Sequence, residues 1–280
     1  MRVFIFIRYV FVVLGRDFYY LFKSKLPLSF RFFFPFCKYY SLILFFLTRR
    51  KVVYYLGNWL WFDNWTVPLS IQAYPAEIKY KILENVESEV GHILDIGGNI
   101  GQFSISAKSF LPHAEVFVFE PNAVPFKLLK KNVKNLKNIH LYPYGVGKEG
   151  VHEFFYVENM TAVGSVLKEN AVSSPIRNGK KLDLIKAKVE FVSDIKAVTS
   201  RSDFDLIKID VEGYEYDVLK YIENVKTKYL FIEVSGSRVK AFSHSNLFSM
   251  VEKKFGAFDV VYQSHATVSL GTFDVLLKIL

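Results

Sequence analysis

The sequence predicts an α/β fold, a mostly parallel seven-stranded sheet with a reversed final strand, preceded by a basic, aromatic N-terminal helical segment. Two observations lead to this prediction. Short apolar runs alternate with amphipathic segments through most of residues 61–280, which is typical of parallel strands joined by crossover helices. Residues 1–60 differ from the rest in charge and aromatic content. We therefore expect residues 1–65 to form the N-terminal segment and residues 66–280 to form one domain.

The first half of the domain shows a regular alternation of strands and helices. Apolar residues at helical spacing (Ile78, Ile82 and Val86) precede Gly91, and Pro112 closes the following helix. The elements expected here are helix 72–90, strand 92–96, helix 102–111, strand 115–119, helix 123–136 and strand 139–143.

Residues 144–200 interrupt this alternation. Several glycines and short β-like runs predict an insertion with a hairpin, and Pro175 and Gly179 predict an irregular stretch near 173–181. After it we expect strand 204–210, helix 214–223, strand 229–234, helix 245–255, and strands 258–263 and 273–279. The last two strands should be antiparallel, because the chain between them is too short for a crossover helix.

The net charge of +9 comes entirely from residues 1–60. That segment holds ten Lys or Arg residues, one acid (Asp17) and 20 of the 48 aromatic residues, whereas residues 61–280 hold 26 basic and 26 acidic residues. The basic patch of a nucleic-acid-binding protein should extend over its working domain. The sequence therefore predicts no nucleic-acid partner.

The basic and aromatic residues of the N-terminal segment suit two arrangements. Their uncharged runs, of which 39–48 and 52–62 are the longest, are too short to span a bilayer. They suit a segment lying on the inner face of a membrane, in contact with anionic lipid, and they also suit helices that pack on the domain. No cleavage site follows the apolar run 3–7, and the lone Cys37 excludes an internal disulfide, so we expect a cytoplasmic protein.

A glycine-bearing turn follows strand 92–96 and opens the next helix. Its residues Asp95, Gly97, Gly98, Asn99 and Gly101 do not have the G-x-G-x-x-G spacing that favours a phosphate. Glycines at such a junction let the backbone approach a ligand closely. Asp95 would repel a pyrophosphate, but it suits a cationic ligand. The alternative is a tight turn without a binding role.

A second acid, Glu120, ends strand 115–119 and is followed by Pro121. A carboxylate at this strand end can accept hydrogen bonds from both ribose hydroxyls of a nucleoside. Together with Asp95, it indicates an adenosine ligand that carries a positive charge and no phosphate. S-adenosyl-L-methionine is the cofactor that fits this description.

Three ordered motifs resemble the FkbM-type methyltransferases, a branch of the class I S-adenosylmethionine-dependent enzymes. They are residues 95–101, residues 119–122 leading to Asn132 and Val133, and residues 206–215 with Val218 and Leu219, and Glu233 and Val234 agree as well. The resemblance covers roughly residues 90–235. It implies a Rossmann-like sheet and methyl transfer to a hydroxyl of a sugar or a secondary metabolite.

The resemblance also implies roles for individual residues. Asp95, Gly97 and Gly101 would line the methionine part of the cofactor, and Glu120 would bind its ribose. The sequence departs from the family pattern in two places: Asp194 is the one acid retained where two are common, and Ser235 stands where a His often follows strand five.

The strand 204–210 carries the expected catalytic chemistry. Alternation places Lys208 and Asp210 on one face, and Glu212 follows in the turn that Gly213 permits. Methyl transfer to an alcohol needs an aligned oxygen and a base. We expect Asp210 or Glu212 to be the base, with Lys208 orienting a carboxylate or neutralising charge. Alternatively, Glu212 caps the helix beginning near Tyr214 and Lys208 merely pairs with Asp210.

Other side chains are weaker candidates. His244 and His265 are candidates to reach the acceptor, and Tyr144 and Tyr214 are candidates to stack on adenine or shape the pocket. No His/Asp cluster at ligand spacing indicates a metal.

We therefore expect an S-adenosylmethionine-dependent O-methyltransferase with a small-molecule or glycan acceptor and peripheral membrane contact through residues 1–60. The alternative is a non-catalytic binding module of the same fold, tethered at a membrane surface. An NAD-dependent oxidoreductase is disfavoured by the glycine spacing.

Overall fold

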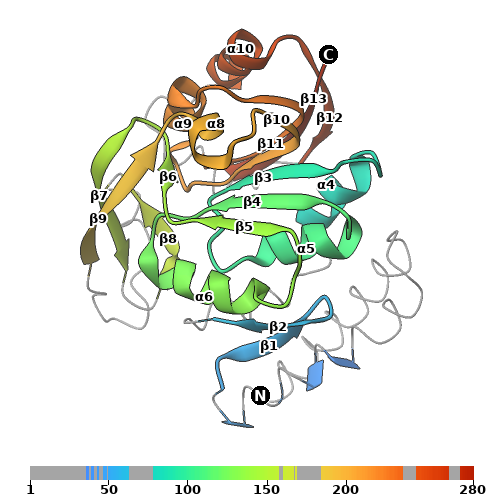
Figure 1. The fold of residues 1–280 in the computed structure, drawn as a ribbon, viewed down its shortest axis with the longest axis vertical. Helices are drawn as coiled ribbons and strands as arrows, with labels where there is room; N and C mark the ends of the chain where they lie inside the picture. The colour runs from blue at the N-terminus through green and yellow to red at the C-terminus, as the bar shows by residue number, and fades with distance from the viewer. Residues whose placement is uncertain are drawn as a thin grey trace, which may run out of the picture.

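A seven-stranded sheet forms the centre of the computed structural model (Figure 1). Along the chain its strands are β3 (His92–Ile96), β4 (Glu115–Phe119), β5 (Ile139–Tyr142), β10 (Asp203–Ile209), β11 (Lys226–Ser235), β12 (Phe258–Gln263) and β13 (Thr272–Ile279). Their order in the sheet is β12-β13-β11-β10-β3-β4-β5, and β13 runs antiparallel to both of its neighbours while the other pairs are parallel. The predicted fold class is confirmed.

The structure describes residues 36–37, 39–40, 43, 47–48, 50–62, 78–157, 160–166, 168, 184–235, 244–264 and 272–280. Its helices include α4 (Ile78–Asn85), α5 (Gln102–Phe110), α6 (Ala123–Val133), α8 (Ile195–Thr199), α9 (Glu215–Tyr221) and α10 (His244–Phe255). The helix expected over 72–90 ends at residue 85, because the chain turns so that Val90, which is buried, can lead into β3.

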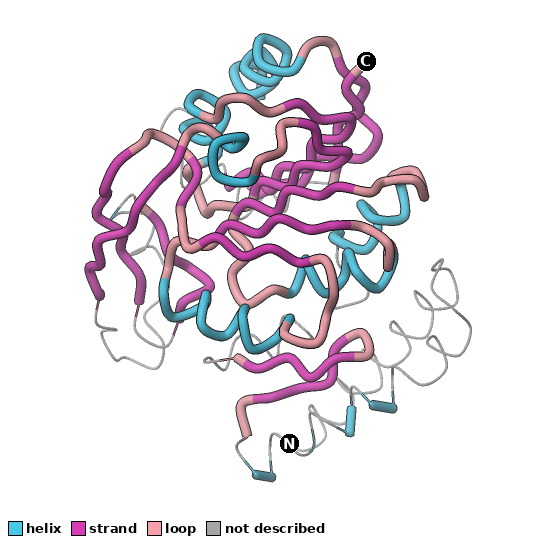
Figure 2. Tube along the Cα trace, in the orientation of Figure 1, coloured by secondary structure: helices cyan, strands magenta, loops and turns pink. Residues whose placement is uncertain are grey.

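Helices cover both faces of the sheet (Figures 1 and 2), and a hydrophobic layer is buried on each face. One layer is formed with α4, α5 and α6, whose buried residues pack against Ile93, Val116 and Leu206. The other is formed with α8, α9 and α10 against the alternate residues Leu94, Phe117 and Ile207. Because both faces are buried, the central strands are largely apolar on both faces rather than alternating, with Asp95 and Lys208 as buried exceptions.

The insertion contains more structure than the hairpin that the sequence predicts. It forms a second, four-stranded sheet in the order β6-β9-β7-β8, with the strands β6 (Gly145–Val146), β7 (Gly150–Val157), β8 (Met160–Ser165) and β9 (Leu184–Val192). Phe154, Val189 and Phe191 of this sheet pack into the same core as α8 and α9. The irregular stretch expected near 173–181 lies outside the described residues.

The end of the N-terminal segment forms a β-hairpin where helices were expected. Its strands β1 (Val52–Tyr55) and β2 (Asn58–Trp61) are joined by Leu56 and Gly57, which both have positive φ (45° and 81°), as a tight hairpin turn requires. The buried side chains of the hairpin share one core with α5 and α6. The division of the chain at residue 65 stays a prediction, but residues 52–62 pack with the domain that was expected to begin at residue 66.

Candidate functional site

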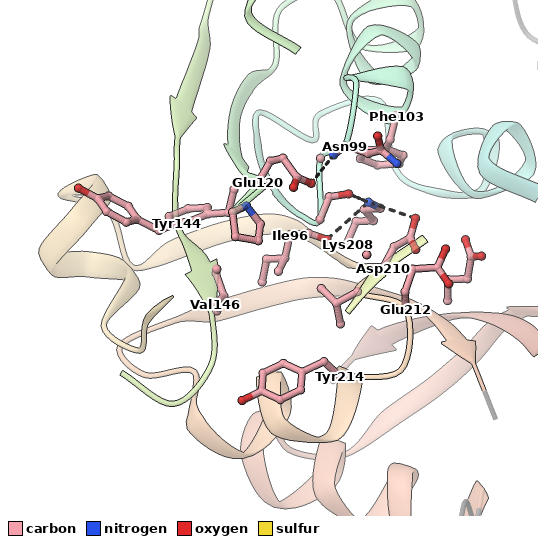
Figure 3. Close-up of a pocket in the computed structure, with 18 of the residues that line it drawn as sticks. Ile96, Asn99, Phe103, Glu120, Tyr144, Val146, Lys208, Asp210, Glu212 and Tyr214 are labelled. Carbon is pink, nitrogen blue, oxygen red and sulfur yellow. Dashed lines mark hydrogen bonds and ion pairs between the residues drawn. The ribbon is translucent and has the colours of Figure 1, made fainter. Parts of the chain in front are cut away.

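A cavity of about 250 Å³ opens at the carboxyl ends of β3, β4, β10 and β11 (Figure 3). Such strand ends are where open α/β sheets bind their ligands. The predicted site residues that line it are Gly97, Gly98, Asn99, Glu120, Pro121, Lys208, Asp210 and Glu212. Two predicted cofactor-binding residues, Asp95 and Gly101, are not part of the lining.

Glu120 is held at the tip of β4 by two backbone groups. Its Oε2 accepts a hydrogen bond from the Asn99 N–H at 2.9 Å, and its Oε1 accepts one from the Asn122 N–H at 2.8 Å. Burial raises the pKa of the carboxyl to about 7, although these two bonds lower it. Each oxygen can still accept one more hydrogen bond, so the carboxylate can bind a pair of hydroxyls.

The glycines of the β3–α5 turn are needed for packing within the protein. A Cβ on Gly97 would lie 1.9 Å from the Asp210 carbonyl oxygen, and one on Gly98 would lie 2.1 Å from Cγ1 of Val118. Gly101 adopts φ 90° at the N-cap of α5. Packing within the protein therefore requires these glycines, and their role as cofactor-binding residues stays a prediction. Gly97 and Gly98 line the cavity, but protein atoms fill the space that their missing side chains leave.

Asp95 is fully buried and already has a cationic partner. The Nζ of Lys208 lies 3.0 Å from its Oδ1, and the Ser104 hydroxyl donates to its Oδ2 at 2.7 Å. The predicted contact of Asp95 with a cationic ligand therefore finds no support, because the lysine already neutralises its charge and no part of it lines the cavity.

Lys208 joins β10 to the glycine turn. Its ammonium donates to the Gly97 carbonyl at 2.7 Å and forms ion pairs with Asp95 and, at 3.3 Å, with Asp210 (Figure 3). The predicted pairing of Lys208 and Asp210 on one strand face is present. An ammonium has three N–H donors, so these partners use all of them. Lys208 thus neutralises buried charge.

The turn between β10 and α9 contains a buried acid that the sequence reasoning missed. Glu215 is 1% exposed, and its Oε1 accepts the Gly213 N–H at 2.8 Å, while its Oε2 is buried without a hydrogen bond. Burial, with a smaller contribution from the carboxylates of Asp210 and Glu233, raises the pKa of Glu215 to about 8. The turn itself is strained, since Glu212 adopts φ 53°.

The second sheet forms an apolar wall of the cavity. Phe154 and Phe191 line it, and their rings pack directly on backbone, as a Cβ on Gly164 or Gly145 would lie 2.5 Å from the respective ring. Glu233, at the end of β11, lines the cavity as well. A charge at the end of an apolar strand could have identified Glu233 from the sequence. No local signal identifies the two phenylalanines.

The remaining candidates have different positions. Tyr144 and Tyr214 both line the cavity, and burial raises the pKa of Tyr214 to about 12 (Figure 3). His244 is the first residue of α10, but its side chain is outside what the structure describes, as is the whole of His265. Asp194 caps α8 through the Ala197 N–H at 2.9 Å. Among the residues that the structure describes, no group of three His, Cys, Asp or Glu side chains could hold a metal ion.

These residues fit S-adenosylmethionine. Glu120 offers two acceptor oxygens to a ribose, and Gln102, which lines the cavity, has a buried Nε2 without a hydrogen-bond partner that can donate to a ligand carboxylate. Phe119 and Pro121 add apolar surface beside Glu120.

Comparison with known proteins points to one family. The FkbM methyltransferase domain matches residues 95–259. Two curated relatives are Methyltransferase 1 of Beauveria bassiana (strain ARSEF 2860), 28% identical over 148 residues, and Methyltransferase sdnD of Sordaria araneosa, 25% identical over 158 residues. Each match covers 47% of this chain, and the chain spans 58% of the first relative's length and 60% of the second's.

Similar solved structures include M. capricolum TrmK in complex with S-adenosyl-homocysteine (11% identity, TM-score 0.42, covering 72% of this chain and 67% of that one). Another is Aeropyrum pernix fibrillarin with natively bound S-adenosyl-L-methionine (11% identity, TM-score 0.41, covering 68% and 66%). Because the family match covers more than half of the chain and contains every residue that lines the cavity, from Ile96 to Glu233, the chain belongs to the FkbM methyltransferase family, whose cofactor is S-adenosylmethionine.

Proposed function

We propose that the protein is an O-methyltransferase that transfers the methyl group of S-adenosylmethionine to a hydroxyl of a sugar or glycan. One observation carries the proposal: three carboxylates at the ends of β10 and β11, those of Asp210, Glu212 and Glu233, line the same cavity as Glu120. Carboxylates accept hydrogen bonds from hydroxyl groups, and a sugar presents several hydroxyls at once. A secondary-metabolite hydroxyl would meet the same requirement.

The aromatic wall supports an acceptor with an apolar face. Phe154, Phe191 and Tyr214 line the same cavity as the carboxylates, and the C–H face of a sugar ring can pack on such rings while its hydroxyls bind the acids. This combination of lining residues favours a compact polyhydroxylated acceptor over a purely apolar one.

The cofactor, when bound, supplies an electrophilic methyl group on a sulfonium. The part of the protein is to align the acceptor oxygen and to take its proton, which can contribute about 7–11 kcal/mol from positioning at best and about 10²–10⁴-fold from a base. We propose that a carboxylate oxygen of Asp210 or Glu212 takes this proton. Lys208 holds Asp210 in place through the 3.3 Å ion pair.

Two isosteric variants distinguish the two carboxylates. Asp210→Asn and Glu212→Gln each remove one proton acceptor and keep the side-chain volume. The variant that lacks the base should lose about 10²–10⁴-fold in kcat and the acid limb of its pH profile, with little change in cofactor affinity. If both variants keep the activity and the pH profile of the wild type, neither residue is the base.

The acceptor itself can be identified by labelling. Purified protein and cofactor with a labelled methyl group are incubated with a fractionated extract of the source cell, and the labelled product is analysed. The proposal expects the label on a carbohydrate oxygen. Label on nitrogen, protein or RNA would refute it, and cofactor binding without any transfer would favour the non-catalytic module.

We also propose that the protein contacts the inner face of a membrane through its N-terminal segment. Phe36, Tyr40, Ile43 and Leu47 have the spacing of one helical face, and all four side chains are 57–76% exposed. The excess of Lys and Arg in residues 1–60 is suited to anionic lipid. No helix in the described part of the chain is long and apolar enough to cross a bilayer.

Sedimentation with anionic liposomes tests this contact. Replacing the four exposed residues by Ser should abolish co-sedimentation and leave the fold unchanged. The matched control replaces Val260 and Val261, two exposed valines of β12, by Ser and should bind as the wild type does. Equal binding of all three proteins would contradict the proposal.

A further inference from the structure

One buried side chain connects the N-terminal hairpin to the cavity. Asn132 of α6 is 5% exposed, and its amide makes three hydrogen bonds. Its Oδ1 accepts the Trp61 N–H at 2.7 Å, and its Nδ2 donates to the Trp61 carbonyl at 2.9 Å and to the Ile100 carbonyl at 2.7 Å. The Asn132 amide therefore pairs with both backbone groups of Trp61, as a neighbouring strand would. It also links the end of β2 to Ile100, which lines the cavity.

A second route joins the same two parts of the molecule. The hydroxyl of Tyr55, a fully buried residue of β1, lies 2.9 Å from the Ser106 hydroxyl, which donates to the Gln102 carbonyl at 2.8 Å. Gln102 also lines the cavity. The two routes thus end on the residues that flank Gly101, whose left-handed conformation begins α5.

Further contacts make the hairpin a fixed support for these bonds. The Nζ of Lys131 lies 3.1 Å from the centre of the Trp61 ring, and Val53, Leu60 and Phe62 are buried in the core shared with α5 and α6. The hairpin packs on α5, whose first residues Gln102 and Phe103 line the cavity, and on α6, beside which it lies in Figure 1.

We propose that Asn132 is a positioning residue, which together with the hairpin holds Ile100–Gln102 in the conformation that binds S-adenosylmethionine. The proposal rests on the cofactor assignment above and deepens it. If hairpin docking and cofactor binding both favour one conformation of this turn, they are coupled, and the coupling is reciprocal. Cofactor binding stabilises the docked hairpin, and loss of the Asn132 bonds weakens cofactor binding.

Hydrogen exchange and calorimetry on the full-length chain measure both directions. Adding S-adenosylhomocysteine to the wild type should slow amide exchange in residues 52–61, although the hairpin does not line the cavity. In Asn132→Ala this slowing should disappear, and the Kd for S-adenosylhomocysteine should rise by about 5–150-fold, the usual range of such coupling. A purely structural role would lower the melting temperature without removing the ligand effect on the hairpin.

Lys130→Ala is the matched control. It removes a side chain of the same helix that lies over the Phe126 ring and leaves the bonds of the hairpin in place, so its Kd should remain within about twofold of the wild type. If Asn132→Ala does not fold, Tyr55→Phe removes only the hydroxyl of the second route, and its Kd should rise severalfold.

Three results overturn the proposal. The first is amide exchange in residues 52–61 of the wild type that does not change when S-adenosylhomocysteine is added. The second is a folded Asn132→Ala variant with the wild-type Kd. The third, where that variant does not fold, is a Tyr55→Phe variant with the wild-type Kd. A wild-type protein that does not bind S-adenosylhomocysteine would instead refute the cofactor assignment, so the two failures are distinguishable.

Discussion

The ammonium of Lys208 lies 3.0 Å from a carboxylate oxygen of Asp95, and the two side chains are 2% and 0% exposed. They come from the adjacent parallel strands β10 and β3, where they stand opposite each other in the register. A buried charge that loses its partner is strongly destabilising, whereas the intact pair contributes little. Replacing only one of these two residues should therefore destabilise the protein strongly.

Lys208→Met should lower the free energy of unfolding by about 3–5 kcal/mol, because it leaves Asp95 buried without a counter-charge. Chemical denaturation measures the change. The control is Lys186→Met, which removes an exposed ion pair with Glu153 and should cost no more than about 1 kcal/mol. Comparable losses in the two variants would contradict the analysis of the buried pair.

Glu215 should make the protein less stable as the pH rises. Its pKa is raised to about 8 from an ordinary 4.5, so the folded state binds the proton more tightly than the unfolded state. The stabilisation is fully present below pH 4.5 and is lost as the pH rises through about 8. Glu215→Gln keeps a neutral acceptor for the Gly213 N–H and should flatten this dependence between pH 5 and pH 8. Unfolding free energies measured across this range test it, and an unchanged slope would count against it.

Glu120 should make cofactor affinity depend on pH. Its pKa is about 7 in the free protein, and ribose hydroxyls donate more strongly to the ionised carboxylate, so affinity should fall as the pH drops below 7. Glu120→Gln should weaken binding by about 10–100-fold at pH 8 and remove the dependence. Calorimetry with adenosine, which has no carboxyl or amino-acid group, isolates this contact. Glu115→Gln, at the opposite end of β4, should bind as the wild type does.

Gly97→Ala should be much more damaging than Gly150→Ala. Both glycines have positive φ (82° and 118°), so both substitutions incur backbone strain of about 1–2 kcal/mol. Only at Gly97 would the new Cβ also collide with backbone, at 1.9 Å from the Asp210 carbonyl oxygen, whereas no atom lies within 4 Å at Gly150. We expect Gly97→Ala to lower the free energy of unfolding by at least about 2 kcal/mol more than Gly150→Ala does, as measured by thermal denaturation. Gly97→Ala should also lose cofactor binding. Equal losses would show that conformation alone requires the glycine.

Much of the fold could be predicted because its signals are local. The strands His92–Ile96, Glu115–Phe119 and Phe258–Gln263 have the bounds that their apolar runs predict, and the final reversed strand followed from a short connection. The hairpin at Val52–Trp61 could not be found in this way. Its aromatic and apolar residues suit a helix or a strand equally, and burial against α5 and α6 selects the strand.

The candidate site divides in the same manner. Strand ends and their acids, such as Glu120 and Asp210, can be located from sequence alone, since parallel strands bring their carboxyl ends to one edge. Which of these acids faces the cavity cannot be predicted from the sequence. Asp95 and Glu120 were predicted as a pair of ligand contacts, but only Glu120 lines the cavity, because Asp95 is buried in an ion pair with Lys208 of the adjacent strand.

By itself, the sequence determined the order of the strands and helices of the central sheet, the family motifs and the concentration of charge in residues 1–60, because each depends on neighbouring residues or on simple composition. The tertiary structure decided which atoms meet: the pairing of Asp95 with Lys208, the aromatic wall of the second sheet, and the bonds from Asn132 to Trp61 and Ile100. These contacts join residues far apart in the chain, and only the closing of the fold brings their atoms within hydrogen-bonding distance.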